Sequence, residues 1–225
     1  MERVAIIGSK CEIGTSIANA FRGLGCPVVG TSSHAKTQLN HPITQYDACS
    51  RGDAAALRKR IGSVDVLIYV AGGSTVSRLV DTTADDLERT MSLNFTGAYD
   101  CCRAFIPDMI AHQFGRIIVI GSSAAHRGVS HLSAYSAAKH ALLGMIRCIA
   151  VEYAAHKITA NMVSPSYVDC TATHDRHNKI TLDKLKQTNP QGHFVDVEQI
   201  ADTCLHIYST PSLNGQAIQL NGGAA

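Results

Sequence analysis

Residues 4–14 read VAIIGSKCEIG, an apolar run followed by a turn that is bounded by two glycines. A continuous apolar run such as Val4 to Ile7 is typical of a strand buried on both faces of a parallel sheet. Residues 13–23 then place apolar side chains at helical spacing, so the turn opens a helix. The stretch therefore predicts a strand, a turn over Gly8 to Gly14 and a helix, which is the first part of a βαβ unit.

The same alternation continues along the chain, and Thr83 with Asp86 and Asp196 with Gln199 are expected to cap two of its helices. It predicts one α/β domain over 1–225, a Rossmann-like doubly wound parallel sheet of about seven strands with helices on both faces. The most irregular stretch, 164–193, is expected to be a substrate loop. Further strands are expected over 28–31, 43–46, 64–70, 116–120, 158–163 and 217–220, and further helices over 54–61, 81–111, 133–156 and 196–208.

Composition excludes several classes of protein. With 45% hydrophobic and 17% charged residues, the chain of 225 residues has enough apolar material for a sizeable core. A net charge of +2 gives no electrostatic reason to expect a nucleic-acid or membrane partner. Met1-Glu2-Arg3 leads directly into the first strand, so we expect no signal peptide and a soluble cytoplasmic protein.

Metal and disulfide chemistry are not expected either. The eight cysteines form no Cys-x-x-Cys pair, which favours reduced thiols in a cytosolic protein. His174 and His177 lie close together but have no Cys or Glu partner at a metal-ligand spacing. We therefore predict no metal site.

The glycine-bounded turn is a candidate dinucleotide site. A helix N-terminus offers unpaired N–H groups and the positive end of the helix dipole to a pyrophosphate, and glycines let the backbone approach it. A plain strand–helix turn explains the same residues equally well. The candidate cofactor-binding residues of this turn are Gly8, Ser9, Lys10, Glu12, Ile13 and Gly14.

A stronger chemical signal lies further along. Ser122 and Ser123 follow the buried run 117–120, where ligands of open α/β sheets bind. Tyr135 and Lys139 are spaced i and i+4, so they share one face of a helix. A free phenol has a pKa near 10, and a neighbouring ammonium is expected to lower it, so that Tyr135 exchanges a proton with a substrate oxygen. Taken singly, each of these residues is equally well explained as a surface or turn residue.

These motifs, in this order, resemble the short-chain dehydrogenase/reductase family over nearly the whole chain. The resemblance implies that Ser122, thirteen residues before Tyr135, is the catalytic serine, and that Asn94 holds a water linked to Lys139. The chain departs from the family pattern at Ile7 and Glu12 in the turn, at Tyr69 and Val70 where two asparagines are usual, and at Ser166 and Cys170.

The resemblance also implies a nicotinamide cofactor. Lys139 would hydrogen-bond its ribose beside Tyr135, and Asp47 would meet the adenine. Ser32, at the end of the second strand, stands where NAD-binding proteins carry a carboxylate. No carboxylate there repels a 2′-phosphate, and the hydroxyls of Ser32 and Ser33 together with His34 or Lys36 could hydrogen-bond one. This favours NADP and leaves NAD open. The remaining implied contacts are Ala71, Gly72, Pro165, Val168 and Thr171.

The leading hypothesis is an alcohol dehydrogenase or carbonyl reductase that interconverts a ketone or aldehyde and an alcohol by hydride transfer. The alternatives are a catalytically silent dinucleotide sensor and a scaffold without nucleotide. Resemblance implies a homotetramer or homodimer through the helices near 83–111 and 133–156. Basic residues within 126–133 and 171–193 favour a polar or anionic small-molecule substrate, unless they are merely solvated; they are His126, Arg127, His131, His174, Arg176, His177, Lys179 and His193.

Overall fold

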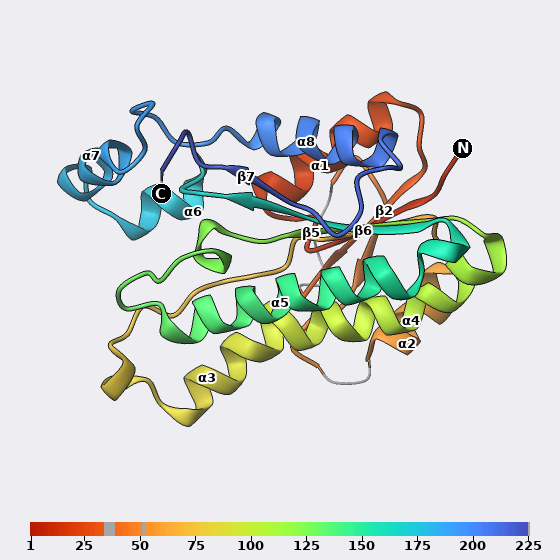
Figure 1. Cartoon of the computed structure of the whole chain (residues 1–225), viewed down its shortest axis with the longest axis horizontal. Coiled ribbons are helices and arrows are strands. Elements are labelled where there is room, and N and C mark those ends of the chain that lie inside the picture. Colours follow the sequence, from red (N-terminus) through yellow and green to blue (C-terminus); the bar gives the residue numbers. More distant parts are fainter. Residues whose placement is uncertain (34–38, 51–52, 225) are drawn as a thin grey trace.

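The computed structural model describes residues 1–33, 39–50 and 53–224, and its strands form one parallel sheet. The spatial order is β3-β2-β1-β4-β5-β6-β7, and the expected α/β doubly wound fold is confirmed (Figure 1). The strands are β1 (Val4–Ile7), β2 (Val28–Ser32), β3 (Ile43–Gln45), β4 (Val66–Tyr69), β5 (Gly115–Ile120), β6 (Ile158–Pro165) and β7 (Ala217–Leu220).

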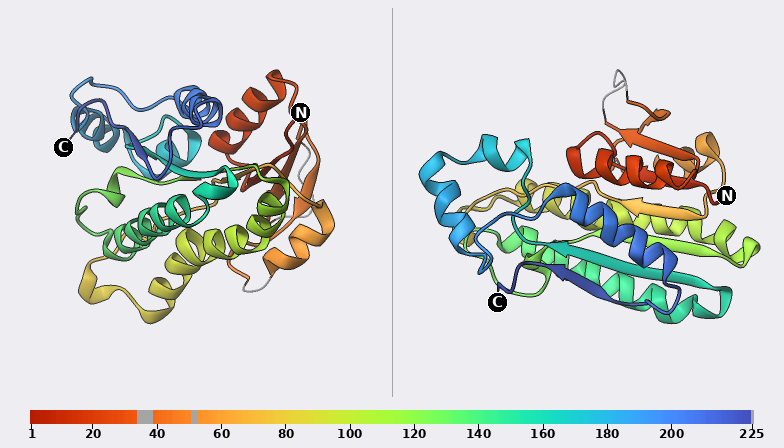
Figure 2. Two further views of the ribbon diagram at one scale, coloured as in Figure 1. Left: turned by 45° about the vertical axis from the view of Figure 1, so that its right-hand side comes forward. Right: turned by 90° about the horizontal axis from the view of Figure 1, so that it is seen from above.

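Helices cover both faces of the sheet. On one face lie α1 (Glu12–Gly23) and α8 (Val197–Ser209), and on the other lie α2 (Asp53–Ile61), α4 (Gly97–His112) and α5 (Ser133–Glu152) (Figures 1 and 2). Each face of the sheet packs against its own apolar core. Every residue of β1, β4 and β5 is therefore buried, whichever face its side chain points to. The strand ends are therefore fixed between two packed layers.

The order of the strands reverses at β1, which pairs with β2 on one side and with β4 on the other. Helix α1, which follows β1, and helix α4, which follows β4, lie on opposite faces of the sheet. This is the switch point at which open α/β sheets form a ligand-binding crevice beyond the carboxyl ends of their strands. The glycine-bounded turn after β1, the segment after β4 and the serines after β5 all lie at this edge. The fold thus brings together the candidate residues that are far apart in the sequence.

The prediction of one helix over 81–111 was wrong. The structure has a 3-10 turn (Leu79–Asp81), α3 (Ala84–Met91), a π-helical segment, η2 (Ser92–Thr96), and then α4. A π turn inserts an extra residue into the helical register and redirects the side chains around it. Gly97 follows that segment as the first residue of α4, and a Cβ there would lie only 2.4 Å from the Ala48 carbonyl oxygen and 2.6 Å from the Tyr69 hydroxyl.

The stretch 164–193 is also more regular than expected. It begins as the last part of β6 and continues into α6 (Thr171–Arg176) and α7 (Lys179–Gln187). Asn178 begins α7 by accepting a hydrogen bond from the Thr181 N–H at 2.9 Å, a local signal that the sequence interpretation missed. The expected helix over 133–156 instead ends at Glu152 and is followed by a 3-10 turn.

The two expected helix caps are confirmed. Thr83 accepts a hydrogen bond from the Asp86 N–H, and Asp196 and Gln199 form a complete capping box. Within the ranges that the structure describes, no helix is long and apolar enough to cross a bilayer.

Candidate active site

The turn after β1 is held in a shape that requires its two glycines. Gly8 has φ +89°, and a Cβ there would lie 2.8 Å from the Ala71 backbone nitrogen. A Cβ on Gly14 would lie 2.6 Å from the Gly8 carbonyl oxygen, so the first turn of α1 packs directly on the strand end. Only glycine allows this close approach of helix and turn.

Ser9 faces the interior rather than the open side of the turn. Its side chain is fully buried, and its N–H donates to the Thr31 carbonyl oxygen at 3.0 Å. A Cβ on Gly30 would collide with the Ser9 hydroxyl, which shows how closely Ser9 packs on β2. Ser9 therefore anchors the turn, whereas the neighbouring Lys10 is exposed.

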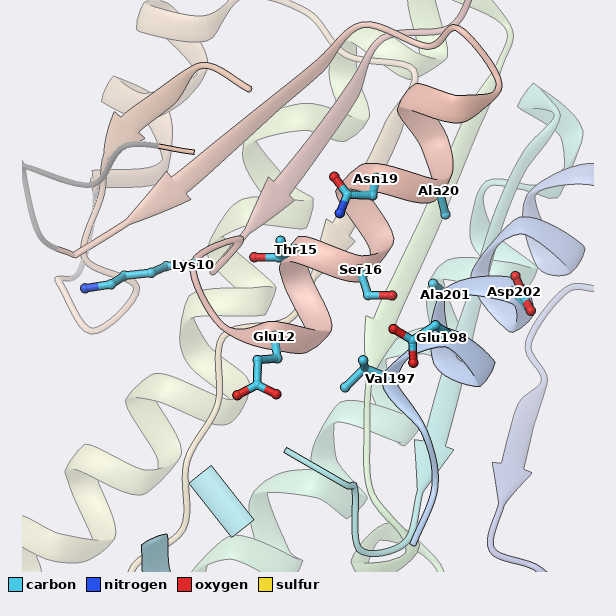
Figure 3. A pocket seen from close by; sticks show the side chains of 10 residues that line it. All are labelled: Lys10, Glu12, Thr15, Ser16, Asn19, Ala20, Val197, Glu198, Ala201 and Asp202. Carbon is cyan, nitrogen blue, oxygen red and sulfur yellow. The ribbon is translucent and has the colours of Figure 1, made fainter. Parts of the chain in front are cut away.

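Glu12, which replaces the family's glycine, is tied to a segment remote in the sequence. Its Oε1 accepts a hydrogen bond from the Thr171 N–H at 2.9 Å, and this contact lowers the pKa of the carboxyl. Figure 3 shows Glu12 and Lys10 pointing in different directions from the turn, at one end of a hollow of about 540 Å³ between α1 and α8. Tyr135 is not among the residues that line this hollow.

Tyr135, Lys139 and Ser122 form the centre of the candidate site. Both Tyr135 and Lys139 lie on α5, and the Lys139 ammonium lies 5.5 Å from the centre of the Tyr135 ring. Lys139 is buried and donates to the Ile120 carbonyl oxygen at 2.9 Å, at the end of β5. Ser122 follows that strand end, and its side chain hydrogen-bonds the Tyr135 phenol.

The expectation that Lys139 lowers the pKa of Tyr135 was wrong for the protein alone. Burial raises the pKa of Tyr135, while the hydrogen bond with Ser122 and the charge of Arg176 lower it less than burial raises it. Burial also lowers the pKa of Lys139 to about 8. Desolvation dominates both groups because the phenolate and the ammonium are each less stable away from water.

Asn94 lies in the π-helical segment η2 and is fully buried. Its amide donates to the carbonyl oxygens of Gly73 (2.7 Å) and Thr90 (2.9 Å) and accepts from the Gly73 N–H. A Cβ on Gly72 would lie 3.0 Å from Asn94 Oδ1 and 3.4 Å from Lys139 Nζ. Asn94 and Lys139 therefore meet at Gly72, which has no side chain to separate them.

Tyr69 supplies a brace that the sequence did not reveal. It replaces an asparagine of the family pattern, is fully buried, and donates a hydrogen bond to the Leu93 carbonyl oxygen at 2.7 Å. Leu93 immediately precedes Asn94, so the hydroxyl connects the end of β4 to the segment that carries Asn94. At this position a larger side chain thus supplies a hydrogen bond that braces the carboxyl end of β4.

We expect Tyr69→Phe to lower the free energy of unfolding by about 1–3 kcal/mol, because it leaves the partly buried Leu93 carbonyl oxygen without this partner. Urea unfolding measures the effect. Tyr46→Phe is the matched control: it also removes a buried hydroxyl, whose partner is the Cys101 sulfur at 3.4 Å, a weak acceptor. Equal losses in the two variants would contradict the role of Tyr69.

The remaining candidate residues surround the same edge of the sheet. Ser32 is buried and Ser33 exposed at the end of β2, whereas His34 and Lys36 lie outside the described residues. Asp47 is exposed, and its carboxylate accepts a hydrogen bond from the Cys49 N–H. Pro165 ends β6, Ile13 is half-buried in α1, and Ala71 and Val168 pack against the two cores.

Comparisons with known proteins identify the family. The family model described as "Enoyl-(Acyl carrier protein) reductase" matches residues 8–225. The chain belongs to the short-chain dehydrogenase/reductase family. It is 31% identical to a 2,3-dihydroxy-2,3-dihydro-p-cumate dehydrogenase of Pseudomonas putida, covering 99% of this chain and 94% of that protein. It is 32% identical to a human 3-oxoacyl-[acyl-carrier-protein] reductase, covering 99% and 98%.

A solved structure supports the fold of this short-chain dehydrogenase/reductase. An oxidoreductase from Burkholderia thailandensis superposes with a TM-score of 0.90 at 24% identity, covering 100% of this chain and 93% of that one. The relatives are oxidoreductases of a family that uses NAD(P)(H), so the chain is an NAD(P)-dependent oxidoreductase in general terms.

The residues present fit a dinucleotide of this kind. The turn keeps the two glycines whose close packing leaves no side chain between the backbone and the crevice. Lys139 is a buried ammonium with three donors, and Ile120 supplies its one hydrogen-bond acceptor among the described residues. The donors left over could hold the hydroxyls of the cofactor's ribose.

Proposed function

We propose that this short-chain dehydrogenase/reductase interconverts a ketone or aldehyde and the corresponding alcohol, with Tyr135 as general acid and base. The single observation that carries the proposal is the convergence of Ser122, Tyr135 and Lys139 beyond the end of β5. The bound cofactor would supply the hydride in reduction or accept it in oxidation.

Each residue of the chain has a role in this proposal. The raised pKa of Tyr135 keeps the phenol protonated near neutral pH, which suits donation of its proton to a carbonyl oxygen. The Ser122 hydroxyl donates a hydrogen bond to that oxygen as negative charge develops there. Lys139 holds the cofactor's ribose and stabilises the phenolate left on Tyr135, and Asn94 fixes the backbone beside it.

Titration with NADPH and NADH, followed by turnover of a panel of ketones and aldehydes, tests the proposal. We propose NADP as the cofactor, because Ser32 and Ser33 bring no carboxylate to repel a 2′-phosphate. Oxidation of NADPH that requires a carbonyl compound is the expected result. Cofactor binding with no turnover of any compound would instead favour the dinucleotide sensor.

Glu12 is expected to weaken cofactor binding. Its lowered pKa keeps the carboxylate charged near neutral pH, beside the turn that would receive a pyrophosphate. Glu12→Gln removes the charge but keeps an oxygen for the Thr171 N–H. We expect the Kd for NADPH, followed by fluorescence, to fall about threefold at low salt and less at high salt, since exposed charges are screened.

Glu12→Ala serves as the matched control because it removes both the charge and the hydrogen bond. An affinity that is unchanged in Glu12→Gln at low salt would show that the carboxylate does not repel the cofactor.

A further inference from the structure

Helix α6 is hydrogen-bonded at both of its ends to segments that border the candidate site. Its first residue, Thr171, donates its N–H to Glu12 of the turn after β1. Its last residue, Arg176, donates from Nη1 to the Ser74 hydroxyl at 3.3 Å, on the segment after β4. Figure 1 shows α6 beyond the carboxyl end of β6. This six-residue helix thus connects the turn after β1 to the segment after β4.

The segment that Arg176 reaches, residues 73–77, is hydrogen-bonded to the residues just before α5, the helix that carries Tyr135. Gly73, the neighbour of Ser74, is held by Asn94, and the Ser77 N–H donates to the His131 carbonyl oxygen at 2.9 Å. Ser77 also forms a β-bridge with Leu132, immediately before α5 begins. The Arg176 guanidinium therefore lies close enough to Tyr135 for its charge to favour the phenolate.

Most other basic side chains of this region are already engaged. His174 pairs with Asp169, His126 contacts the Ser164 hydroxyl, and His131 contacts the Ser130 hydroxyl. Arg176 forms no ion pair with any carboxylate of the described residues, and the neutral Ser74 hydroxyl is its hydrogen-bond partner. A guanidinium has five donors, so most of its capacity for an anion is unused.

We propose that Arg176 binds a carboxylate of the substrate and orients its carbonyl or hydroxyl group toward Tyr135 and Ser122. A planar guanidinium binds a carboxylate through two parallel hydrogen bonds, which fixes orientation as well as charge. The substrate class is therefore a short oxo acid and the matching hydroxy acid. This inference rests on the proposed function, because it assigns the substrate of the same site.

Binding measurements test the proposal without requiring turnover. Calorimetric titrations with the NADPH complex use 2-hydroxybutanoate, 3-hydroxybutanoate and 4-hydroxypentanoate, each beside its neutral amide. Since the reduced cofactor cannot oxidise an alcohol, these are non-reacting complexes. We expect at least one acid to bind about 10- to 100-fold more tightly than its amide, and Arg176→Gln to abolish that preference.

Two controls separate charge from structure. Lys184→Gln removes an exposed cation from the neighbouring helix α7 and should leave the preference unchanged. Arg176→Lys keeps the charge without the planar pair of donors and should retain only part of the preference for the acid over its amide. The proposal is overturned if no acid binds more tightly than its amide, or if Arg176→Gln leaves the preference intact. Turnover of a neutral ketone that requires Tyr135 would, in that event, leave the proposed function standing.

Discussion

Replacement of Tyr135 by Phe is expected to lower kcat/KM for carbonyl reduction by about 10²- to 10⁴-fold, the usual contribution of a positioned proton donor. The aromatic ring and its packing beside Lys139 remain, and only the hydroxyl that hydrogen-bonds Ser122 is lost. Stopped-flow or steady-state oxidation of NADPH with the best ketone of the panel measures the loss.

The same variant should still bind NADPH with a Kd close to that of the unmodified protein, because the turn after β1 and Lys139 are unchanged. Ser122→Ala is the companion variant: it leaves the proton donor in place and removes a hydrogen bond to the developing oxyanion. Full reductase activity in Tyr135→Phe would contradict the proposed mechanism, whatever Ser122→Ala does.

The sheet and the centre of the site follow from local features of the sequence. Apolar runs such as 4–7 and 117–120 are buried on both faces because helices cover the sheet on both sides. Ser122, Tyr135 and Lys139 are predictable because each lies at a strand end or on one helix face, where spacing alone determines direction.

Contacts between distant segments were not predictable in the same way. The Glu12–Thr171 hydrogen bond joins residues 159 positions apart, and no local pattern records it. The π turn around Asn94 depends on Gly97 packing against Ala48 and on the Tyr69 hydroxyl reaching Leu93. The pKa of Tyr135 is likewise set by burial, which only the assembled layers determine.

Lys139→Met is expected to abolish most of the activity. At neutral pH the variant should nevertheless be more stable than the unmodified protein, and this advantage should shrink as the pH rises. Burial lowers the pKa of Lys139 to about 8 from an ordinary value of 10.5. That difference corresponds to roughly 3 kcal/mol that the folded protein loses by keeping the ammonium charged. A group kept at such a cost beside Tyr135 is typical of catalysis rather than of structure.

The pH dependence has a definite sign. Below about pH 8 Lys139 is protonated in both the folded and the unfolded chain, so its cost to stability is constant. Between about pH 8 and 10.5 the unfolded chain binds more protons at this residue, so its contribution to the free energy of unfolding rises with pH.

Urea unfolding of the unmodified protein and of Lys139→Met at several pH values isolates the contribution of Lys139, since other titrating groups cancel in the difference. The unmodified protein should gain up to roughly 3 kcal/mol on the variant across that window, and a difference that does not change with pH would show that Lys139 is not desolvated.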